Sequence, residues 1–401
     1  VRAPLETRCR PAETGCLGRE LDRARGFAAG GLGVTLWLGP VVAVSHPYFD
    51  TRLKRDPDYL GKKDRFIAGR NAEAYLSVQG RFGEVFFGSV DRNWGPGGVE
   101  GLLLSPAPYG YDHLGLVVGT AGLRLEGILT QLDDLPDAGG VANHRYLVAH
   151  RLVVRPPGSV VISLWEGTIV AGPGRELEPW YANILSLGLL AQYDQGTSSN
   201  NQVGADLQAL LGGTRVFGQL LLDDIQIDRR SAGDREPTAY GFTLGFERGL
   251  GPAAVTAFYT RVANLAYRTP NPAETVMRRG VGLARNYSDY DQLTVRAGLV
   301  TAAGALLTPE LTLLRQGEGD FRRPYPPVAA YDTTPGFLAG TVERTLRLGL
   351  DARLDRGPLG LAAEVGVHVI DNADHLAGRR DTRVLGRVGL TWRFRKESVL
   401  P

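Results

Sequence analysis

The sequence predicts an all-β protein: a transmembrane antiparallel β-barrel of about 18 strands with a short N-terminal periplasmic segment. Three observations support this prediction. Apolar and polar residues alternate in segments of about ten to thirteen residues from Gly33 almost to the end of the chain. The 53 glycines and 15 tyrosines favour strands joined by many turns. No apolar run reaches the roughly 18 residues that a membrane-spanning helix needs.

The segment 345–355 is the clearest example of this alternation. Successive side chains of a strand point to opposite faces, so one face of this segment is apolar and the other is polar. After a turn at 356–358, the alternation resumes in 359–369. The apolar face of the first segment carries Leu346, Leu348, Leu350, Ala352 and Leu354, and the polar face carries Arg347, Gly349, Asp351, Arg353 and Asp355.

Strand length separates a membrane barrel from a soluble β-sandwich, whose strands also alternate. Sandwich strands usually run about five or six residues, whereas tilted membrane strands need about nine to eleven. The segments of this chain are of the longer kind. We therefore expect the apolar face to meet lipid and the small or polar face to meet a wet lumen.

A barrel with both ends in the periplasm needs an even number of strands. Seventeen candidates can be read, among them 34–45 and 181–193, and 99–105 supplies an eighteenth. Towards the C-terminus, long connections then fall on the outer side and short ones on the inner side, with a less regular pattern between 119 and 180. The long connections are Asp371–Thr382, Gln316–Thr341, Tyr267–Tyr290 and Asp228–Pro237, and the short ones are Asp355–Pro358, Arg248–Pro252 and Gly212–Thr214.

The last predicted strand ends on two aromatic residues at two-residue spacing. Arg387 and Gly389, followed by Trp392 and Phe394, resemble the C-terminal recognition signal of bacterial outer-membrane barrels. This resemblance implies the barrel assembly machinery as a partner and the bacterial outer membrane as the location. The tail 395–401 departs from the pattern, since such barrels often end at the aromatic residue.

Three parts are expected along the chain: a periplasmic segment 1–32, a transmembrane barrel 33–394 and a C-terminal tail 395–401. The chain begins at Val1 and its single methionine is Met277, as a cleaved secretion signal or a trimmed chain would give. Cys9 and Cys16 are the two cysteines. A disulfide between them would fit an oxidising compartment, and two free thiols are the alternative.

Charge and motifs argue against several classes of function. The formal net charge is only +2, so we expect no nucleic-acid partner. Asp223 and Asp224 face opposite sides of a strand, and His144 lies about 20 Å from His150 along an extended chain, so neither pair predicts a metal site. The glycines at 95–98 are not followed by the Lys-Ser or Lys-Thr of a phosphate loop. With no Gly-x-Ser-x-Gly elbow either, we expect no cofactor, no metal and no catalysis.

Several motifs occur in order between about residue 64 and residue 225. They are Asp91–Gly98 with Leu102–Ser105, Tyr146–Leu152, Glu166, Asn200–Asn201 and Gly218–Ile225. Together they resemble the Wzi-type capsule assembly family of outer-membrane proteins. The resemblance implies an eighteen-stranded barrel that attaches capsular polysaccharide to the cell surface. The segment before the first strand, about thirty residues, is too short for the helical periplasmic bundle of the better-known members.

The first of these motifs is a candidate ligand-binding or structural element. Its glycines permit a sharp bend, Pro96 stiffens it, and Trp94 can anchor at a membrane interface or cover a sugar face. A structural turn and a ligand contact are thus both open. The residues singled out are Asp91, Arg92, Trp94, Gly95, Pro96 and Gly97.

The predicted outer loop 267–290 supplies candidate glycan contacts, because sugars stack on aromatic rings and bond to charged groups. We predict a protein that attaches or organises surface polysaccharide, with that polysaccharide, outer-membrane lipid and lipopolysaccharide as partners. A passive porin for small polar solutes and a structural membrane anchor for a surface assembly are the alternatives. The candidate contacts are Arg278, Arg279, Tyr287, Asp289 and Tyr290.

Overall fold

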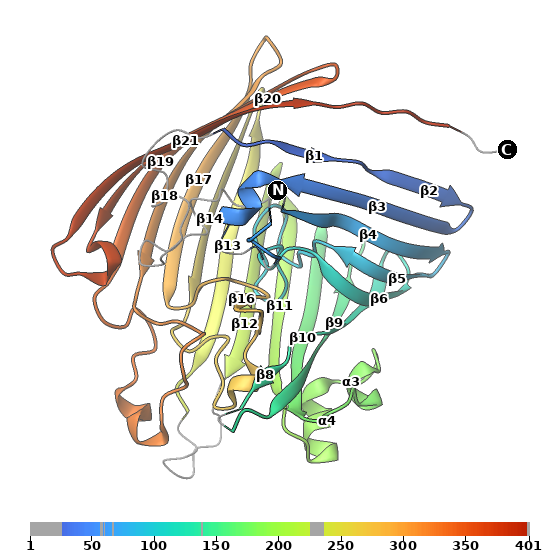
Figure 1. Cartoon of the computed structure of the whole chain (residues 1–401), viewed down its shortest axis with the longest axis vertical. Helices are drawn as coiled ribbons and strands as arrows, with labels where there is room; N and C mark the ends of the chain where they lie inside the picture. The colour runs from blue at the N-terminus through green and yellow to red at the C-terminus, as the bar shows by residue number, and fades with distance from the viewer. Residues whose placement is uncertain are drawn as a thin grey trace.

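The computed structural model describes residues 26–56, 59, 61–65, 68–137, 139–224 and 236–398. Most of these residues belong to one curved antiparallel sheet (Figure 1), which confirms the all-β prediction. Among the residues described, no helix is long and apolar enough to cross a membrane. The predicted Cys9–Cys16 disulfide lies outside the described residues.

Apart from two short strands, each strand of the main sheet pairs with the next strand of that sheet along the chain, as in a meander. Two short pieces, β15 (Met277–Arg278) and β16 (Val281–Gly282), form a separate hairpin within a connection. The strands of the main sheet are β1 (Ala29–Gly31), β2 (Val34–Leu38), β3 (Val41–Asp50), β4 (Gly69–Gly80), β5 (Gly83–Val90), β6 (Tyr111–Gly119), β7 (Leu123–Gln131), β8 (Leu135–Pro136), β9 (Ala142–Val154), β10 (Val160–Pro173), β11 (Asn200–Leu211), β12 (Thr214–Asp224), β13 (Ala239–Leu250), β14 (Ala253–Val262), β17 (Tyr290–Val300), β18 (Leu306–Gln316), β19 (Glu343–Arg356), β20 (Leu359–Asp371) and β21 (Arg380–Trp392).

The two edges of the sheet are β21 and the pair β1 and β2. Both β1 and β2 pair with β3, and β21 pairs with β20. Within the described part of the chain, no pairing joins β21 to β1 or β2, so the sheet curls without closing. The predicted number of eighteen strands is therefore not established.

Connections of two kinds alternate along the sheet, as the sequence predicted near the C-terminus. The connections at one end of the strands, here called the short-turn edge, are tight turns. The connections at the other end, here called the long-loop edge, contain more residues. The short turns are 39–40, 81–82, 120–122, 155–159, 212–213, 251–252, 301–305 and 357–358, and the long connections are 51–68, 91–110, 132–141, 174–199, 225–238, 263–289, 317–342 and 372–379.

Three predicted strands are wrong. The segment 34–45 is a hairpin, because Gly39 adopts a left-handed φ of 61° and Pro40 follows it in a tight turn between β2 and β3. The segment 181–193 lies in the connection that forms α3 (Pro179–Ala182) and α4 (Gly188–Gln195). Pro179 suits the first turn of a helix, and Gly196 ends α4 in the left-handed region.

The third wrong strand is 99–105, which has no partner strand among the described residues. Its backbone groups bond instead to side chains and to other loops. The Leu102 N–H donates to Gln219 Oε1 at 2.7 Å, and the Ser105 N–H donates to the Leu283 carbonyl at 3.0 Å. Once these three errors are removed, the irregular connections expected between 119 and 180 become regular.

The two faces of the sheet divide as predicted. On β19, Leu348 and Leu350 are exposed on the outer, convex face, whereas Arg347 on the inner face is only 1% exposed. The C-terminal strand follows the same rule. Arg387 points inward to Glu364, and the exposed, stacked rings of Trp392 and Phe394 lie on the other side.

Candidate functional site

The 91–110 connection, here called the plug loop, folds onto the inner face of the sheet instead of extending away from it. Leu102, Leu103 and Leu104 are fully buried there with Trp94. Gly167 on β10 makes room for this contact, because a Cβ at Gly167 would lie 2.3 Å from Leu103 Cδ1. The plug loop is therefore built into the inner wall. The wall residues in the same core are Ile128, Leu147, Ala149, Trp165, Ile169, Leu221 and Val262.

The tip of the plug loop reaches toward the short-turn edge. Val99 packs with Phe217 of β12 and Phe258 of β14. The Arg215 guanidinium, just after the short turn 212–213, donates to the Gly97 carbonyl at 3.4 Å and pairs with Glu247 at 2.6 Å. Since Arg215 lies next to a short turn, the plug loop runs from the long-loop edge along much of the length of the strands.

Asn93 explains why the Trp-Gly-Pro-Gly motif bends as it does. Its Oδ1 accepts from the N–H groups of Gly95 at 3.0 Å and Gly101 at 2.9 Å, and its Nδ2 donates to the Val99 carbonyl at 3.0 Å. Gly101 must lack a side chain, since a Cβ there would lie 2.3 Å from the Leu104 carbonyl oxygen. The motif is a compact loop held by one asparagine that the sequence analysis did not single out.

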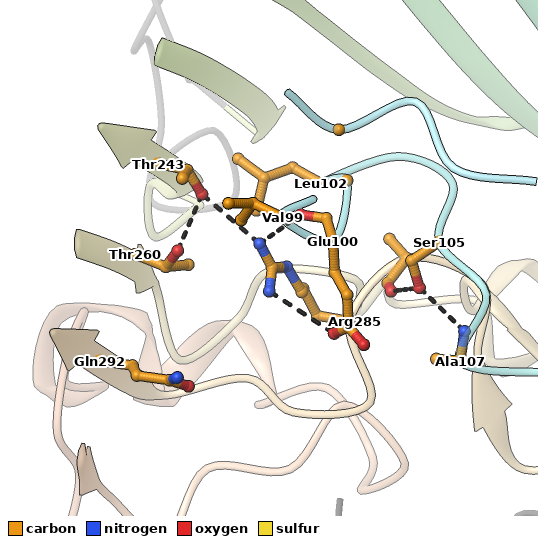
Figure 2. A network of polar contacts seen from close by, with 12 residues as sticks. Val99, Glu100, Leu102, Ser105, Ala107, Thr243, Thr260, Arg285 and Gln292 are labelled. Carbon is orange, nitrogen blue, oxygen red and sulfur yellow. Dashed lines mark hydrogen bonds and ion pairs between the residues drawn. The ribbon is translucent and has the colours of Figure 1, made fainter. Parts of the chain in front are cut away.

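A second connection, 263–289, packs against the plug loop (Figure 2). The Arg285 guanidinium donates to the Glu100 carbonyl and lies 3.6 Å from the Glu100 carboxylate, and the Ser105 hydroxyl donates to the Ala284 carbonyl. On the wall behind them, the hydroxyls of Thr243 and Thr260 are 2.9 Å apart. Two loops and the inner wall thus form one network.

Polar wall residues fix the 263–289 loop as well. The buried Arg145 guanidinium donates to the carbonyls of Ala273 and Thr275. Asp223 accepts from Gln202 Nε2 at 2.7 Å and from the Tyr267 N–H. Asp223 therefore anchors a loop. The side chain of Asp224 lies outside the described residues.

The predicted motif residues have structural partners. Arg92 Nε donates to His113 Nε2 at 2.8 Å, and the Arg92 guanidinium lies 4.4 Å from the Phe86 ring centroid. Trp94 is 6% exposed, so in this conformation neither lipid nor sugar reaches its ring. Asp91 is exposed, Gly95 is half-buried and Pro96 is buried, while Gly97 lies at the exposed tip.

The predicted glycan contacts of the outer loop divide into two groups. Asp289 and Tyr290 are buried, and Asp289 accepts from the N–H groups of Gly319, Leu338 and Ala339. These two side chains are thus turned inward rather than presented outside. The other three keep more access to solvent: Arg278 lies 5.5 Å from the Tyr111 ring centroid, the Arg279 N–H donates to Asp133 at 2.7 Å, and Tyr287 contacts Tyr290 edge-on.

A ladder of charges runs across the inner face of β17 to β21, on the part of the wall nearer the C-terminus. Arg296 pairs with Glu310 at 2.5 Å, and the buried Arg347 contacts both Glu310 and, at 3.3 Å, Glu364. Arg387 then pairs with Glu364 at 2.6 Å. The sequence placed Arg347 on the polar face, but the cross-strand register was needed to show that these charges neutralise each other.

A groove of about 360 Å³, here called the rim groove, opens on the outer face beside the long-loop edge. The Arg261 guanidinium lies 3.8 Å from the Phe337 ring centroid and 5.6 Å from that of Tyr240. Arg261 Nε is buried and has no hydrogen-bond partner among the described residues. Aromatic rings beside charged groups suit a sugar. The lining is Glu236, Pro237, Thr238, Tyr240, Arg261, Tyr331, Asp332, Thr334, Gly336 and Phe337.

His150 and Glu166 form a buried histidine–carboxylate pair on the outer face of β9 and β10. His150 Nδ1 lies 2.9 Å from Glu166 Oε1, a pairing that can orient a general base. No serine, threonine or cysteine side chain bonds to His150 in the described part of the chain. Likewise, no group of three His, Cys, Asp or Glu residues that could hold a metal ion occurs among the residues described.

Comparisons with known proteins bear on the fold. No protein-family model and no curated relative matches the sequence. Wzi of Escherichia coli, described as an outer-membrane protein involved in group 1 capsule assembly and a carbohydrate-binding β-barrel, is similar with a TM-score of 0.60 at 14% identity. The similarity covers 92% of this chain and 83% of Wzi. The chain has the fold of an outer-membrane β-barrel.

The resemblance predicted from the sequence is thus confirmed in the structure. OccK10 (OpdN) and OccD3 (OpdP) of Pseudomonas aeruginosa are also similar, with TM-scores of 0.46 and 0.48 at 10% and 12% identity. Each similarity covers 92% of this chain, and 96% and 87% of the other chain, respectively.

Proposed function

We propose that this protein is a bacterial outer-membrane barrel that attaches or organises surface polysaccharide without catalysis. The observation that carries the proposal is the plug loop, which fills the inner face of the wall with buried leucines and is tied to the 263–289 loop. A transport channel needs its inner face open to solute, and this part of the wall is covered. An attachment protein needs no open lumen.

The rim groove supports a saccharide as the ligand. Its rings offer apolar faces for the C–H groups of a sugar, and Arg261, Asp332 and Glu236 offer hydrogen bonds to hydroxyl or charged groups. It also lies at the long-loop edge, which we assign to the cell exterior because the long loops of bacterial barrels are extracellular. Arg278 and Arg279 on the neighbouring loop 263–289 remain candidate contacts.

The proposal is tested by applying the refolded protein to an array of bacterial capsular and O-antigen polysaccharides. Phe337→Ala and Arg261→Gln should weaken retention of the bound glycan at least tenfold, since they remove the ring and the cation of the groove. Phe82→Ala is the matched control, because Arg81 lies 5.0 Å from the Phe82 ring centroid in an exposed turn at the opposite edge. Absence of binding to any polysaccharide, or equal binding by the groove variants, would count against the proposal.

A passive porin is the second candidate, and the charge ladder favours it. Arg296 and Arg387 remain partly exposed on the inner face of β17 and β21, where a wet passage would place charges. Conductance separates the two candidates. A porin passes ions steadily, whereas an attachment protein with a fixed plug loop does not.

A further inference from the structure

The 174–199 connection, here called the outer flap, folds back over the outer face of the sheet. In Figure 1 its helices α3 and α4 lie outside the wall, at the lower right. Tyr181 and Ala191 of these helices are buried against Val148 of β9 and Val170 of β10. Side chains at alternate positions of β9 and β10 point to the outer face. The flap therefore covers side chains that would otherwise face lipid.

The covered wall includes polar side chains, unlike the wall beside it. Ile162 and Leu164 share one face of β10 with Glu166 and Thr168, because side chains of equal parity point the same way. Leu164 is 55% exposed, whereas Glu166 is buried under the flap. An isolated carboxylate facing acyl chains would carry a large desolvation cost. The flap removes that cost.

Bonds at the start of α4 satisfy the carboxylate. The Gly188 N–H donates to both Glu166 oxygens, at 2.9 and 3.0 Å, and His150 Nδ1 lies 2.9 Å from Oε1. A carboxylate is favoured at a helix N-terminus, where free N–H groups point outward. Gly188 is required for this approach, since a Cβ there would lie 2.3 Å from Thr168 Oγ1.

One further contact, from Asn201, holds α4 to the wall, and another joins Tyr181 to Ser199 within the flap itself. Asn201 of β11 accepts from the Thr168 hydroxyl at 2.7 Å and donates to Gln192 of α4. The Tyr181 hydroxyl donates to Ser199 Oγ at 3.1 Å. The small or polar residues of α4 that face the wall are Gly188, Ala191 and Gln192, at helical spacing.

The opposite side of the flap is apolar and uncovered. Leu185 is 82% exposed, Leu190 is 60% exposed and Tyr193 is 77% exposed, with Leu187 and Leu189 beside them. No charged residue occurs from Pro179 to Tyr193, while Glu178 and Asp194 flank that stretch. An uncharged apolar surface of this kind suits a lipid environment.

We propose that the outer flap is an amphipathic anchor immersed in the membrane, with its leucines in contact with lipid acyl chains. This inference rests on the proposed function in one respect, that the sheet spans the outer membrane. Lipid is the occupant because the apolar side of the flap continues the exposed apolar belt of the wall. The exposed Leu164 lies two residues from Glu166 on the same face of β10, and the flap covers Glu166. The flap thus replaces lipid over a polar stretch of wall and restores an apolar outer surface.

Site-directed spin labelling tests this. Leu190→Cys is made in a Cys9→Ser, Cys16→Ser background, labelled, and refolded into phosphatidylcholine vesicles, with heat-modifiable migration as the check of folding. Accessibility to oxygen and to a water-soluble nickel complex is compared with Leu164→Cys on the wall and Phe82→Cys in an exposed turn. We expect the oxygen-to-nickel ratio at position 190 to be within about twofold of that at position 164 and at least tenfold above that at position 82.

A ratio at position 190 equal to that at position 82 would overturn the anchor and place the flap in water. Shielding from both reagents, with spin–spin broadening that disappears on dilution with unlabelled protein, would overturn it in favour of a second copy on this face. If position 164 itself is open to nickel, the proposal that the sheet spans a membrane fails. This result distinguishes failure of the proposed function from failure of the anchor alone. Leu187→Cys repeats the measurement should the first variant not fold.

Discussion

The Tyr267 hydroxyl donates a hydrogen bond to the Leu102 carbonyl at 3.0 Å and so joins two loops separated by 165 residues in the chain. Both residues are buried. Leu102 is held from its other side by Gln219 of β12, whose Nε2 also donates to the Trp94 carbonyl at 3.0 Å. The loops on the inner face are therefore bonded to each other and to the wall, as a fixed plug requires.

Replacing Tyr267 by Phe should loosen this plug. The change removes one hydroxyl and leaves the buried Leu102 carbonyl without its donor, at an expected cost of about 1–3 kcal/mol. Urea unfolding of the refolded protein should show the loss, and planar bilayers should show more frequent brief openings. Tyr193→Phe, at an exposed position of the outer flap, should change neither reading.

Gly101→Ala should distort the plug loop, whereas Gly97→Ala should be tolerated. At position 101 the new Cβ would meet backbone, 2.3 Å from the Leu104 carbonyl oxygen and 2.8 Å from the Gly95 nitrogen. At position 97 it would meet the end of the flexible Arg215 side chain, which can move aside. The measurement is protease sensitivity of the folded protein within residues 91–110. Equal sensitivity of the two variants would contradict the loop geometry.

Arg347→Gln should destabilise the sheet strongly. The substitution leaves Glu310 and Glu364 buried with less compensation, and removing one partner of a buried charge network costs about 3–5 kcal/mol. Arg393→Gln is the control, because its pair with Asp355 is exposed and worth at most about 1 kcal/mol. The two variants are compared by the temperature at which heat-modifiable migration is lost.

Glu274 gives a pH-dependent prediction. Burial raises the pKa of its carboxyl. The Ser198 hydroxyl, which donates to the carboxylate at 3.0 Å, lowers this pKa but does not cancel the effect of burial. Because the pKa is raised in the folded state, the protonated Glu274 carboxyl contributes to the free energy of unfolding below its unfolded-state pKa of about 4.3. That contribution is lost as pH rises through the folded-state pKa. Glu274→Gln should therefore stabilise the protein at pH 7, with the gain shrinking as pH falls to about 4.

Urea unfolding at several pH values checks this prediction. Glu176→Gln removes an exposed charge from the outer flap and controls for the change in net charge. A gain from Glu274→Gln that stays constant between pH 7 and pH 4 would show that burial of the ionised carboxyl is not its cause.

Local alternation made the strands predictable, because each strand shows its two faces within its own sequence. The segment Leu102–Ser105 was misread as a strand, because its apolar run has no period. Its backbone hydrogen bonds are made with Gln219, Tyr267 and Leu283, which are far away in the chain. The outer flap was misread as a strand because its two helices are short. Pro179 in the first turn of α3 and Gly196 at the end of α4 were the sequence signals of helices there.

The residues of the candidate site could not be predicted where their contacts depend on the pairing of strands or on the path of a loop. The charge ladder needs the register that places Arg347 opposite Thr312 and His368, and a single sequence does not contain that register. The rim groove brings Arg261 to Phe337, which lies 76 positions further along the chain, through a loop whose path depends on Asp289. Its aromatic and charged residues are individually ordinary for a barrel.

Single-channel recording tests the central claim most directly. The refolded wild-type protein is compared in planar bilayers with a variant whose plug-loop residues 95–103 are replaced by a short Gly-Ser linker, and heat-modifiable migration confirms that both have folded. We predict that the wild type is silent and that the variant conducts or flickers open. Steady nanosiemens-scale openings of the wild type would contradict a lumen blocked by the plug loop and favour the porin.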